Sequence, residues 1–334
     1  MVQTEASILC DYLIRECEKG DGLVSNIKLT IQYATANVIH HIIFGYRWDY
    51  DNPEWRRLVK RLYDFFAINL IAMPENFIPA LKYVPPLNHL ISRNQDKTLR
   101  EVTTAIEEYV SSQIEEHRSS YCEGEIRDFV DLYIKYEQEH KEFYTKENIF
   151  QVILDLFRAG SDTTATSISW ATLYLVKFPD IQEALREEID KAIGSRPYVK
   201  EDKPKLIKTR AFVNEVHRHV SVAPLAPPHT VDKPTQVEGY TIPPNTLVQP
   251  NLYFIHHDDQ YWTDPDKFNI NRWIGEDGEL LKHEGHFMPF SIGKGHAAGR
   301  HNNTISKRLK LPYSEYLISI ITSLDWIITV ICNP

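Results

Sequence analysis

The chain has 334 residues, of which 43% are hydrophobic and 25% are charged, and its formal net charge is −9. This length allows one large hydrophobic core or two modest ones. The acidic balance argues against a nucleic-acid binder, because such proteins normally present a basic face.

Apolar residues at helical spacing predict a mainly helical chain up to about residue 220. Gly45 and Pro179 are expected to end two of these helices, and Pro53 is expected to begin a third. Residues 67–90 are apolar but broken by prolines, which predicts a loop with short helical turns. The predicted helices cover residues 1–20, 27–44, 52–66, 93–117, 128–139, 145–178, 179–193 and 210–220.

The texture of the chain changes after residue 224. Residues 224–251 are rich in proline and β-branched residues, with strand-like pieces at 236–242 and 246–249. Residues 243–245, Pro-Pro-Asn, are expected to form the turn between these pieces. One mainly helical domain with a small β region is the simplest architecture.

The cysteines and the apolar runs bear on the cellular compartment. No two cysteines form a C-x-x-C pair, which fits a reducing compartment better than a disulfide scaffold. The first residues are polar, so no signal peptide is expected, and Asp325 interrupts the most apolar run, residues 316–332. The scattered cysteines are Cys10, Cys17, Cys122 and Cys332.

The long helix predicted over residues 145–178 is weakened at its centre, where the sequence is Ala-Gly-Ser-Asp-Thr-Thr from Ala159 to Thr164. Gly160 costs about 1 kcal/mol relative to alanine in a helix interior. The hydroxyls of Thr163 and Thr164 compete for backbone carbonyls. The stretch is either a groove where another group packs beside Asp162 or a helix crossing that needs small residues.

Two further blocks stand in a suggestive order. Glu215 and Arg218 lie three residues apart on one predicted helix, where they can pair, although most such pairs are solvated and weak. They are followed by Asp-Pro-Asp-Lys-Phe-Asn-Ile-Asn-Arg-Trp, which contains Arg272, and then by Phe-Ser-Ile-Gly-Lys at residues 290–294.

Together these blocks resemble the cytochrome P450 haem-thiolate monooxygenases, in particular the animal microsomal kind, over roughly residues 10–294. The resemblance implies a mainly α fold, here an incomplete cytochrome P450 fold with a small β region. Glu215 and Arg218 look like the family's E-x-x-R pair, and Arg272 looks like the arginine that closes its salt-bridge triad. Phe290 and Gly293 look like the start of the haem-ligand loop.

The same resemblance implies roles for the helix centre and for one strand. Asp162 and Thr163 look like the acid and alcohol that deliver protons to bound oxygen. Ala159 and Gly160 look like the groove residues that leave room for oxygen beside the haem. His229 matches the family's position for a haem-propionate contact, and an ordinary strand-end histidine is the equal alternative.

The sequence departs from the family at the iron ligand. The family holds haem iron by a cysteine thiolate, which its pattern puts four residues after Gly293. That position is Ala297, which cannot ligate iron, while His296 is one residue out of register and Cys332 lies far downstream. We therefore expect this exact chain to bind haem weakly or not at all, and we expect no metal ligand among its site residues.

Both ends of the chain also differ from the family pattern. We expect residues 1–294 to form a partial cytochrome P450 domain and residues 295–334 to be an unrelated or misframed segment. By the resemblance, the chain is expected to start near the family's fourth or fifth helix, without the membrane anchor and the early strands. Trp55 and Arg56 are not the family's propionate-binding pair, because they follow the predicted 27–44 helix instead of preceding it.

The activity implied by the resemblance is haem-dependent oxidation of a small lipophilic substrate by oxygen. Electrons would come from NADPH–cytochrome P450 reductase, at the cytosolic face of the endoplasmic reticulum membrane. The expected substrate surface combines residues 65–83 with the face of residues 157–164. The alternative functions are a catalytically inactive fragment or binding-only protein and a plain helical scaffold. The alternative location, for a chain without an anchor, is the cytosol.

Overall fold

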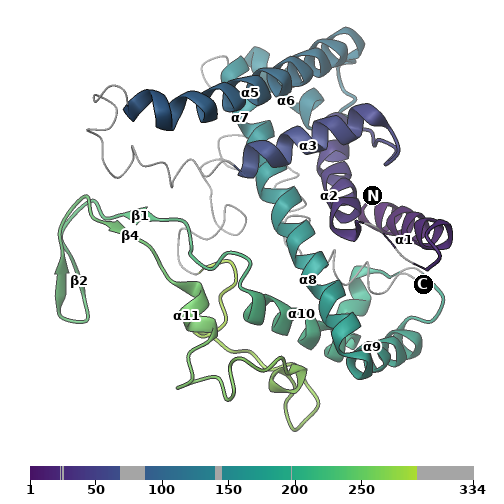
Figure 1. Ribbon diagram of the computed structural model, residues 1–334, viewed down its shortest axis with the longest axis vertical. Coiled ribbons are helices and arrows are strands. Elements are labelled where there is room, and N and C mark those ends of the chain that lie inside the picture. Colours follow the sequence, from purple (N-terminus) through teal and green to yellow (C-terminus); the bar gives the residue numbers. More distant parts are fainter. Residues whose placement is uncertain (23, 25, 68–86, 140–144, 197, 292–334) are drawn as a thin grey trace. The chain divides into compact units, whose positions relative to one another are not determined.

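A computed structural model describes residues 1–291 except 23, 25, 68–86, 140–144 and 197. These residues are mainly helical, with two short antiparallel strand pairs (Figure 1). They divide into two compact units, one formed by Asp11–Ala165 with Met1 and the other by Val2–Cys10 with the chain from Thr166 onward. The mainly α architecture with a small β region is confirmed.

Most helices form where their sequence patterns predict them, and several boundaries differ. The helix predicted over residues 93–117 covers residues 87–120, so it includes the end of the predicted loop, and the helix predicted from residue 210 begins at Ile207. The remainder of the predicted loop, residues 68–86, lies outside the described residues. The α-helices are α1 (Val2–Lys19), α2 (Ile27–Phe44), α3 (Pro53–Ala67), α5 (Leu87–Ser120), α6 (Phe129–Glu139), α7 (Lys146–Phe157), α8 (Thr163–Lys177), α9 (Pro179–Ala192), α10 (Ile207–Val220) and α11 (Leu252–His256).

The helix predicted over residues 145–178 is not continuous. Between α7 and α8 the chain forms a π-helical turn, η2 (Arg158–Asp162), in which the hydrogen-bond ladder widens by one residue. Gly160 lies in this turn, and the Thr163 hydroxyl donates to the Ala159 carbonyl at 2.7 Å. The weakness of the sequence at this point therefore appears as a change of helix type.

The β region pairs differently from the expected pattern. The piece predicted as one strand over residues 236–242 is itself a hairpin, in which β2 (Thr235–Val237) pairs with β3 (Tyr240–Ile242). Glu238 and Gly239 both have positive φ, 46° and 83°, as a type I′ turn requires. Strand β4 (Leu247–Val248) pairs instead with β1 (His229–Thr230), so residues 243–245 do not join paired strands.

Helix α2 forms the centre of the first unit, where it contacts α3, α6, α7 and η2. The side chain of Asn26 accepts a hydrogen bond from the Leu29 N–H at 3.1 Å and caps its beginning. Gly45 ends it in the left-handed conformation, with φ 79°. The apolar side chains of α2 are buried nearly all round, as expected of a central helix: Ile31, Ala34, Ala36, Val38, Ile39, Ile43 and Phe44.

One polar side chain, His40, lies fully buried in this core and is satisfied by hydrogen bonds. Its Nδ1 donates to the Tyr46 carbonyl at 2.9 Å. Its Nε2 accepts from the Tyr109 hydroxyl at 2.6 Å and from the Trp48 indole N–H at 3.2 Å. Burial lowers the pKa of His40 to about 4, so the imidazole is neutral and of one tautomer near pH 7.

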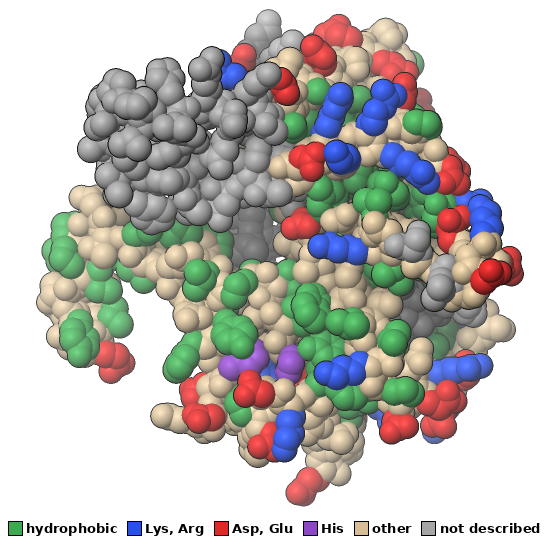
Figure 2. Space-filling model, in the orientation of Figure 1, with side chains coloured by type: hydrophobic (Ala, Val, Ile, Leu, Met, Phe, Trp, Pro, Cys, Tyr) green, Lys and Arg blue, Asp and Glu red, His purple; other side chains and the backbone are tan. Residues whose placement is uncertain are grey.

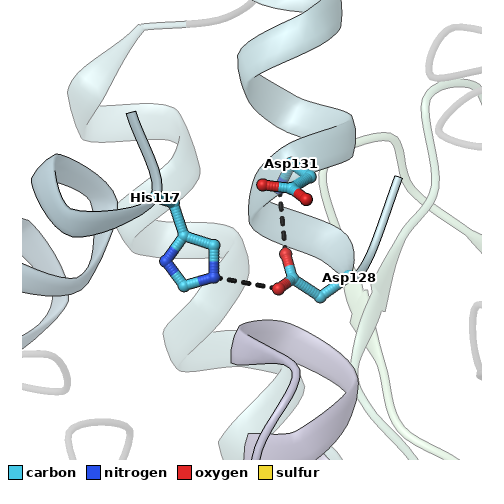
Figure 3. Close-up of side chains that lie close together, drawn as sticks. All are labelled: His117, Asp128 and Asp131. Carbon is cyan, nitrogen blue, oxygen red and sulfur yellow. Dashed lines mark hydrogen bonds and ion pairs between the residues drawn. The ribbon is translucent and has the colours of Figure 1, made fainter. Parts of the chain in front are cut away.

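A second buried histidine, His117 at the end of α5, has acceptors at both ring nitrogens, and one of them is the Asp128 carboxylate (Figure 3). It donates through Nδ1 to the Gln113 carbonyl at 2.7 Å and through Nε2 to Asp128 Oδ2 at 2.9 Å. The other oxygen of Asp128 accepts from the Asp131 N–H at 2.9 Å and caps α6. The hydrogen bond to Asp128 and the nearby carboxylates raise the pKa of His117 against the opposing effect of burial.

The cluster of His117, Asp128 and Asp131 has the side-chain types and the spacing of a metal site, since one possible ligand atom from each residue lies within 4.8 Å of the others. Its atoms are already engaged in ion pairs. Asp131 holds the Arg127 guanidinium through contacts of 2.6 and 2.8 Å, and that positive charge would repel a cation. A Cβ on Gly45 would lie 2.8 Å from Asp128 Oδ2. Glycine at the end of α2 therefore leaves the space that the Asp128 carboxylate occupies.

The raised pKa of His117 makes the stability of the fold depend on pH. An unfolded histidine titrates near pH 6.5, and the folded pKa of His117 is higher. Its stabilisation is therefore complete below about pH 6.5 and is lost as the pH rises through the folded pKa. The free energy of unfolding, measured in urea across this range, is expected to separate the wild type from His117→Gln most at the acid end.

An exposed histidine supplies the control for this experiment. His229 lies on β1, and its side chain is exposed. His229→Gln is therefore expected to leave the pH dependence of the unfolding free energy unchanged. A difference between wild type and His117→Gln that stays constant with pH would show that folding does not raise the pKa of His117.

The surface and the helices add two general observations. On the face of the described residues drawn in Figure 2, Lys and Arg side chains are interspersed with Asp and Glu. Such mixing gives that face no single-sign field. Within the described ranges, no helix is both long and apolar enough to cross a bilayer.

Candidate functional site

Helix α10 carries a fully buried ion pair in the second unit. Glu215 and Arg218 are three residues apart, so they lie on one face of the helix, and both are 0% exposed. Arg218 Nε donates to Glu215 Oε2 at 2.8 Å and Arg218 Nη2 donates to Glu215 Oε1 at 2.9 Å. The parallel fork is the strong geometry for a guanidinium and a carboxylate.

Arg272 completes a cluster of three charges. It lies on the short 3₁₀ helix η4 (Ile270–Trp273), and its Nε donates to Glu215 Oε1 at 3.1 Å. Its two terminal nitrogens donate to the carbonyls of Thr263, Asp264 and Lys267 at 3.0–3.3 Å. Arg272 thus bridges the buried carboxylate and a segment that has little regular structure.

Several groups in this cluster were not singled out from the sequence. The Trp273 indole N–H donates to Glu215 Oε2, and the Asn269 main-chain N–H donates to Oε1, both at 2.9 Å. The Trp262 ring lies 5.3 Å from the Arg218 guanidinium carbon and 5.8 Å from that of Arg272. The signal available was composition: both tryptophans lie in the stretch dense in Asp, Pro and aromatic residues.

Both cations of the cluster have acceptors beyond the single carboxylate. Arg218 also donates to the carbonyls of His256 and Pro265, at 2.7 and 2.9 Å. These carbonyls, with the face of Trp262, compensate the excess positive charge. The structure therefore brings Glu215, Arg218 and Arg272 together as a satisfied, buried network.

The first unit holds the other group of candidate residues, at the π turn. Gly160 is buried, while Ala159 and Thr163 are exposed. Asp162 is half-buried, and burial raises the pKa of its carboxyl, partly offset by the charge of Lys28. A carboxyl with a raised pKa next to an exposed hydroxyl is a group that can hold and release a proton nearer neutral pH.

The opposite side of the same turn faces the protein interior. Ser161 Oγ and Thr164 Oγ1 are buried and have no hydrogen-bond partner among the described residues. Phe157 is 3% exposed, and its ring lies 6.3 Å from that of His40. Phe157 is therefore a core residue, and the substrate surface expected at the face of residues 157–164 stays a prediction.

The remaining candidates are only partly described. His229 lies on β1, opposite Val248, and is exposed. Phe290 is 38% exposed, and its ring lies 5.9 Å from that of His217 on α10. Gly293 and Ala297 lie outside the described residues, as does most of the expected substrate surface at residues 65–83.

The cluster predicts a large stability cost for Arg272→Ala. The change removes a donor to a buried carboxylate and leaves three carbonyls without their partner. Breaking a buried ion pair typically costs about 3–5 kcal/mol, and urea unfolding should show a loss of this size. Arg272→Lys is expected to recover little of it, because lysine lacks the planar fork.

Lys267→Ala is the matched control, because Lys267 forms an exposed pair with Asp264 on the same segment. Its loss is expected to stay below about 0.5 kcal/mol. A comparably small loss for Arg272→Ala would reclassify the triad as an ordinary surface network.

Comparison with known proteins gives a consistent result. A sequence model described as Cytochrome P450 matches residues 1–301. Cytochrome P450 2B2 of Rattus norvegicus is 35% identical over 301 residues, covering 88% of this chain and 59% of the relative. Cytochrome P450 2U1 of Homo sapiens is 35% identical over 272 residues, covering 79% and 48%.

A third relative, Cytochrome P450 1A1 of Sparus aurata, is 35% identical over 301 residues, covering 86% of this chain and 56% of the relative. The chain spans about half the length of the curated relatives that it matches. With the E-x-x-R pair and Arg272 in one buried network, and with the match extending over most of the sequence, the chain belongs to the cytochrome P450 family.

Proposed function

We propose that this chain carries part of a haem-dependent monooxygenase that oxidises a small lipophilic substrate with oxygen. Electrons would be supplied by NADPH–cytochrome P450 reductase at the cytosolic face of the endoplasmic reticulum membrane. The family supports the reaction class, and the microsomal relatives support the partner and the membrane. The observation that carries the proposal is the π turn, because single π turns inside helices frequently lie at functional sites.

The residues around the π turn suit the oxygen side of a haem. Gly160 has no side chain, so it allows a flat group to approach, and Ala159 adds only a methyl group. When bound, haem would supply the redox chemistry. The polypeptide would position a proton at the Thr163 hydroxyl and pass protons from solvent through the half-buried Asp162 carboxyl.

The opposite side of the haem site does not fit. The family's iron ligand is a cysteine thiolate, and the matching position is Ala297, whose methyl group has no donor atom. We therefore propose that the chain as printed is catalytically inactive, and no reaction step is assigned to a bound haem. His229, Phe290 and Gly293 remain proposed contacts of the cofactor in an intact family member.

The change of sequence character near Lys294 suggests a reason for the missing ligand. We propose that residues 1–294 are the partial family domain and that residues 295–334 are unrelated or misframed; the family match ends at residue 301. The transcript across Lys294 tests this directly. A frame that encodes Arg-x-Cys-x-Gly would identify the printed end as an error, whereas an unbroken transcript of the printed frame would refute that explanation.

The first functional prediction concerns haem. The expressed chain is expected to bind haem weakly or not at all, and its reduced form with carbon monoxide should lack the red-shifted Soret band of thiolate ligation. Ala297→Cys supplies the missing donor and should increase that band. A thiolate band from the unmodified chain would contradict the assignment of Ala297 to the ligand position.

The second concerns Asp162 and Thr163 in a protein with the complete family domain and the restored cysteine. Thr163→Ala is expected to keep substrate binding but to divert reducing equivalents to peroxide, and Asp162→Asn to slow turnover. General acid–base help is typically worth 10²–10⁴-fold, so the ratio of product to peroxide should fall clearly. Product, peroxide and melting temperature are measured on the same variants.

A purely structural role makes a different prediction for these two side chains. If they only stabilise the break between α7 and α8, the melting temperature falls and the ratio of product to peroxide stays constant. A conservative control is Ser169→Ala, on α8 beyond the π turn. An unchanged ratio in Thr163→Ala would rule out proton delivery whatever happened to stability.

A further inference from the structure

Residues 284–291, which lead into and past Phe290, form turns and belong to no helix or strand. Their position therefore depends on contacts with other parts of the second unit. Ring contacts join His286 to Tyr261 and Phe287 to Trp273, and Met288 adds two further contacts with the rest of the second unit. The Met288 side chain is buried in a small core with Ala226 and Leu252. The Met288 main-chain N–H donates to Nε2 of His256 at 3.1 Å.

The hydrogen bonds of His256 define its protonation. A main-chain N–H can only donate, so Nε2 of His256 is an acceptor and carries no proton. The proton is then on Nδ1, which donates to Ser221 Oγ at 2.8 Å, and Ser221 donates to the Arg218 carbonyl at 3.0 Å. His256 is 0% exposed, and burial lowers its pKa to about 4, which agrees with a neutral ring.

The main chain of His256 is tied to the same place. Its carbonyl accepts from Arg218 Nη1 at 2.7 Å. His256 therefore accepts one hydrogen bond from Arg218 of the buried triad and another from Met288. Two residues further on, Phe290 lies against His217, which is on α10 like Arg218.

We propose that His256 is a positioning residue: its Nε2 fixes Met288, and thereby sets the position of Phe290 against α10, at the start of the predicted haem-ligand loop. The relevance of that loop to a cofactor rests on the proposed function. The positioning itself rests on the described contacts alone. Through His256, the triad of Glu215, Arg218 and Arg272 determines the start of the loop as well as the segment it holds directly.

The alternative is that His256 only fills space in the core. A matched pair of variants separates the two. The side-chain amide of His256→Gln can reach the position of Nε2 and accept from Met288, whereas His256→Asn reaches only the position of Nδ1 and Ser221. A space-filling role predicts that the two amides behave alike.

Hydrogen exchange measured by mass spectrometry on the full chain provides the local readout. In His256→Asn, exchange of the peptide covering residues 284–291 is expected to speed up roughly tenfold or more, because a buried donor has lost its acceptor. Protection of α10 should stay as in the wild type. His256→Gln should restore most of the protection, and His257→Asn, the neighbouring half-exposed histidine, should change neither region.

Two results would overturn the proposal. Equal exchange in His256→Asn and His256→Gln would show that the acceptor at Nε2 is not what holds Met288. Loosening of α10 by as much as residues 284–291 would show general destabilisation. Either result counts against a positioning role.

A second arm connects His256 to the cofactor. In the Ala297→Cys background, His256→Asn is expected to reduce the thiolate band several-fold relative to His256→Gln. If the two variants differ in hydrogen exchange but give equal thiolate bands, His256 affects local structure only, and its proposed role in the loop is overturned. If Ala297→Cys alone gives no thiolate band, the proposed function fails, and the exchange experiment still decides the positioning by His256.

Discussion

The second unit depends on one buried carboxylate. Glu215 is fully buried, and a buried charge is stable only if it is paired and hydrogen-bonded. Two guanidinium groups, an indole N–H and a main-chain N–H together donate five hydrogen bonds to its two oxygens. Three of those donors come from residues 269–273. The carboxylate therefore attaches to α10 a segment that no sheet pairing or long helix holds in place.

The first unit solves the same problem of buried polarity in two other ways. His40 is kept neutral by burial and by fixed donors and acceptors, whereas the hydrogen bond to the Asp128 carboxylate raises the pKa of His117 and favours its charged form. The choice follows from the partner: a carbonyl and two donors stabilise the neutral ring, and a carboxylate with a carbonyl stabilises the cation. Both networks lie around α2, where the backbone needs Gly45 to end the helix and to admit Asp128.

The π turn differs from these networks, because its interior hydroxyls, Ser161 and Thr164, have no partner among the described residues. Stability alone would favour alanine or valine at such positions. Local rules broken without a compensating contact are expected at functional sites. The turn therefore supports a chemical role for the adjacent Asp162 and Thr163.

The sequence by itself determined the helices, the weakness at Gly160 and the pairing of Glu215 with Arg218, because these depend on periodicity and on neighbours three or four residues apart. Only the tertiary structure decided the rest. The hairpin within residues 235–242 depends on a positive φ at Glu238, which glutamate rarely adopts. The contacts of Trp262 with Arg218, of Trp273 with Glu215 and of His256 with Ser221 join residues 35 to 58 positions apart. Such contacts arise when distant donors converge on a buried acceptor, and no local pattern records that convergence.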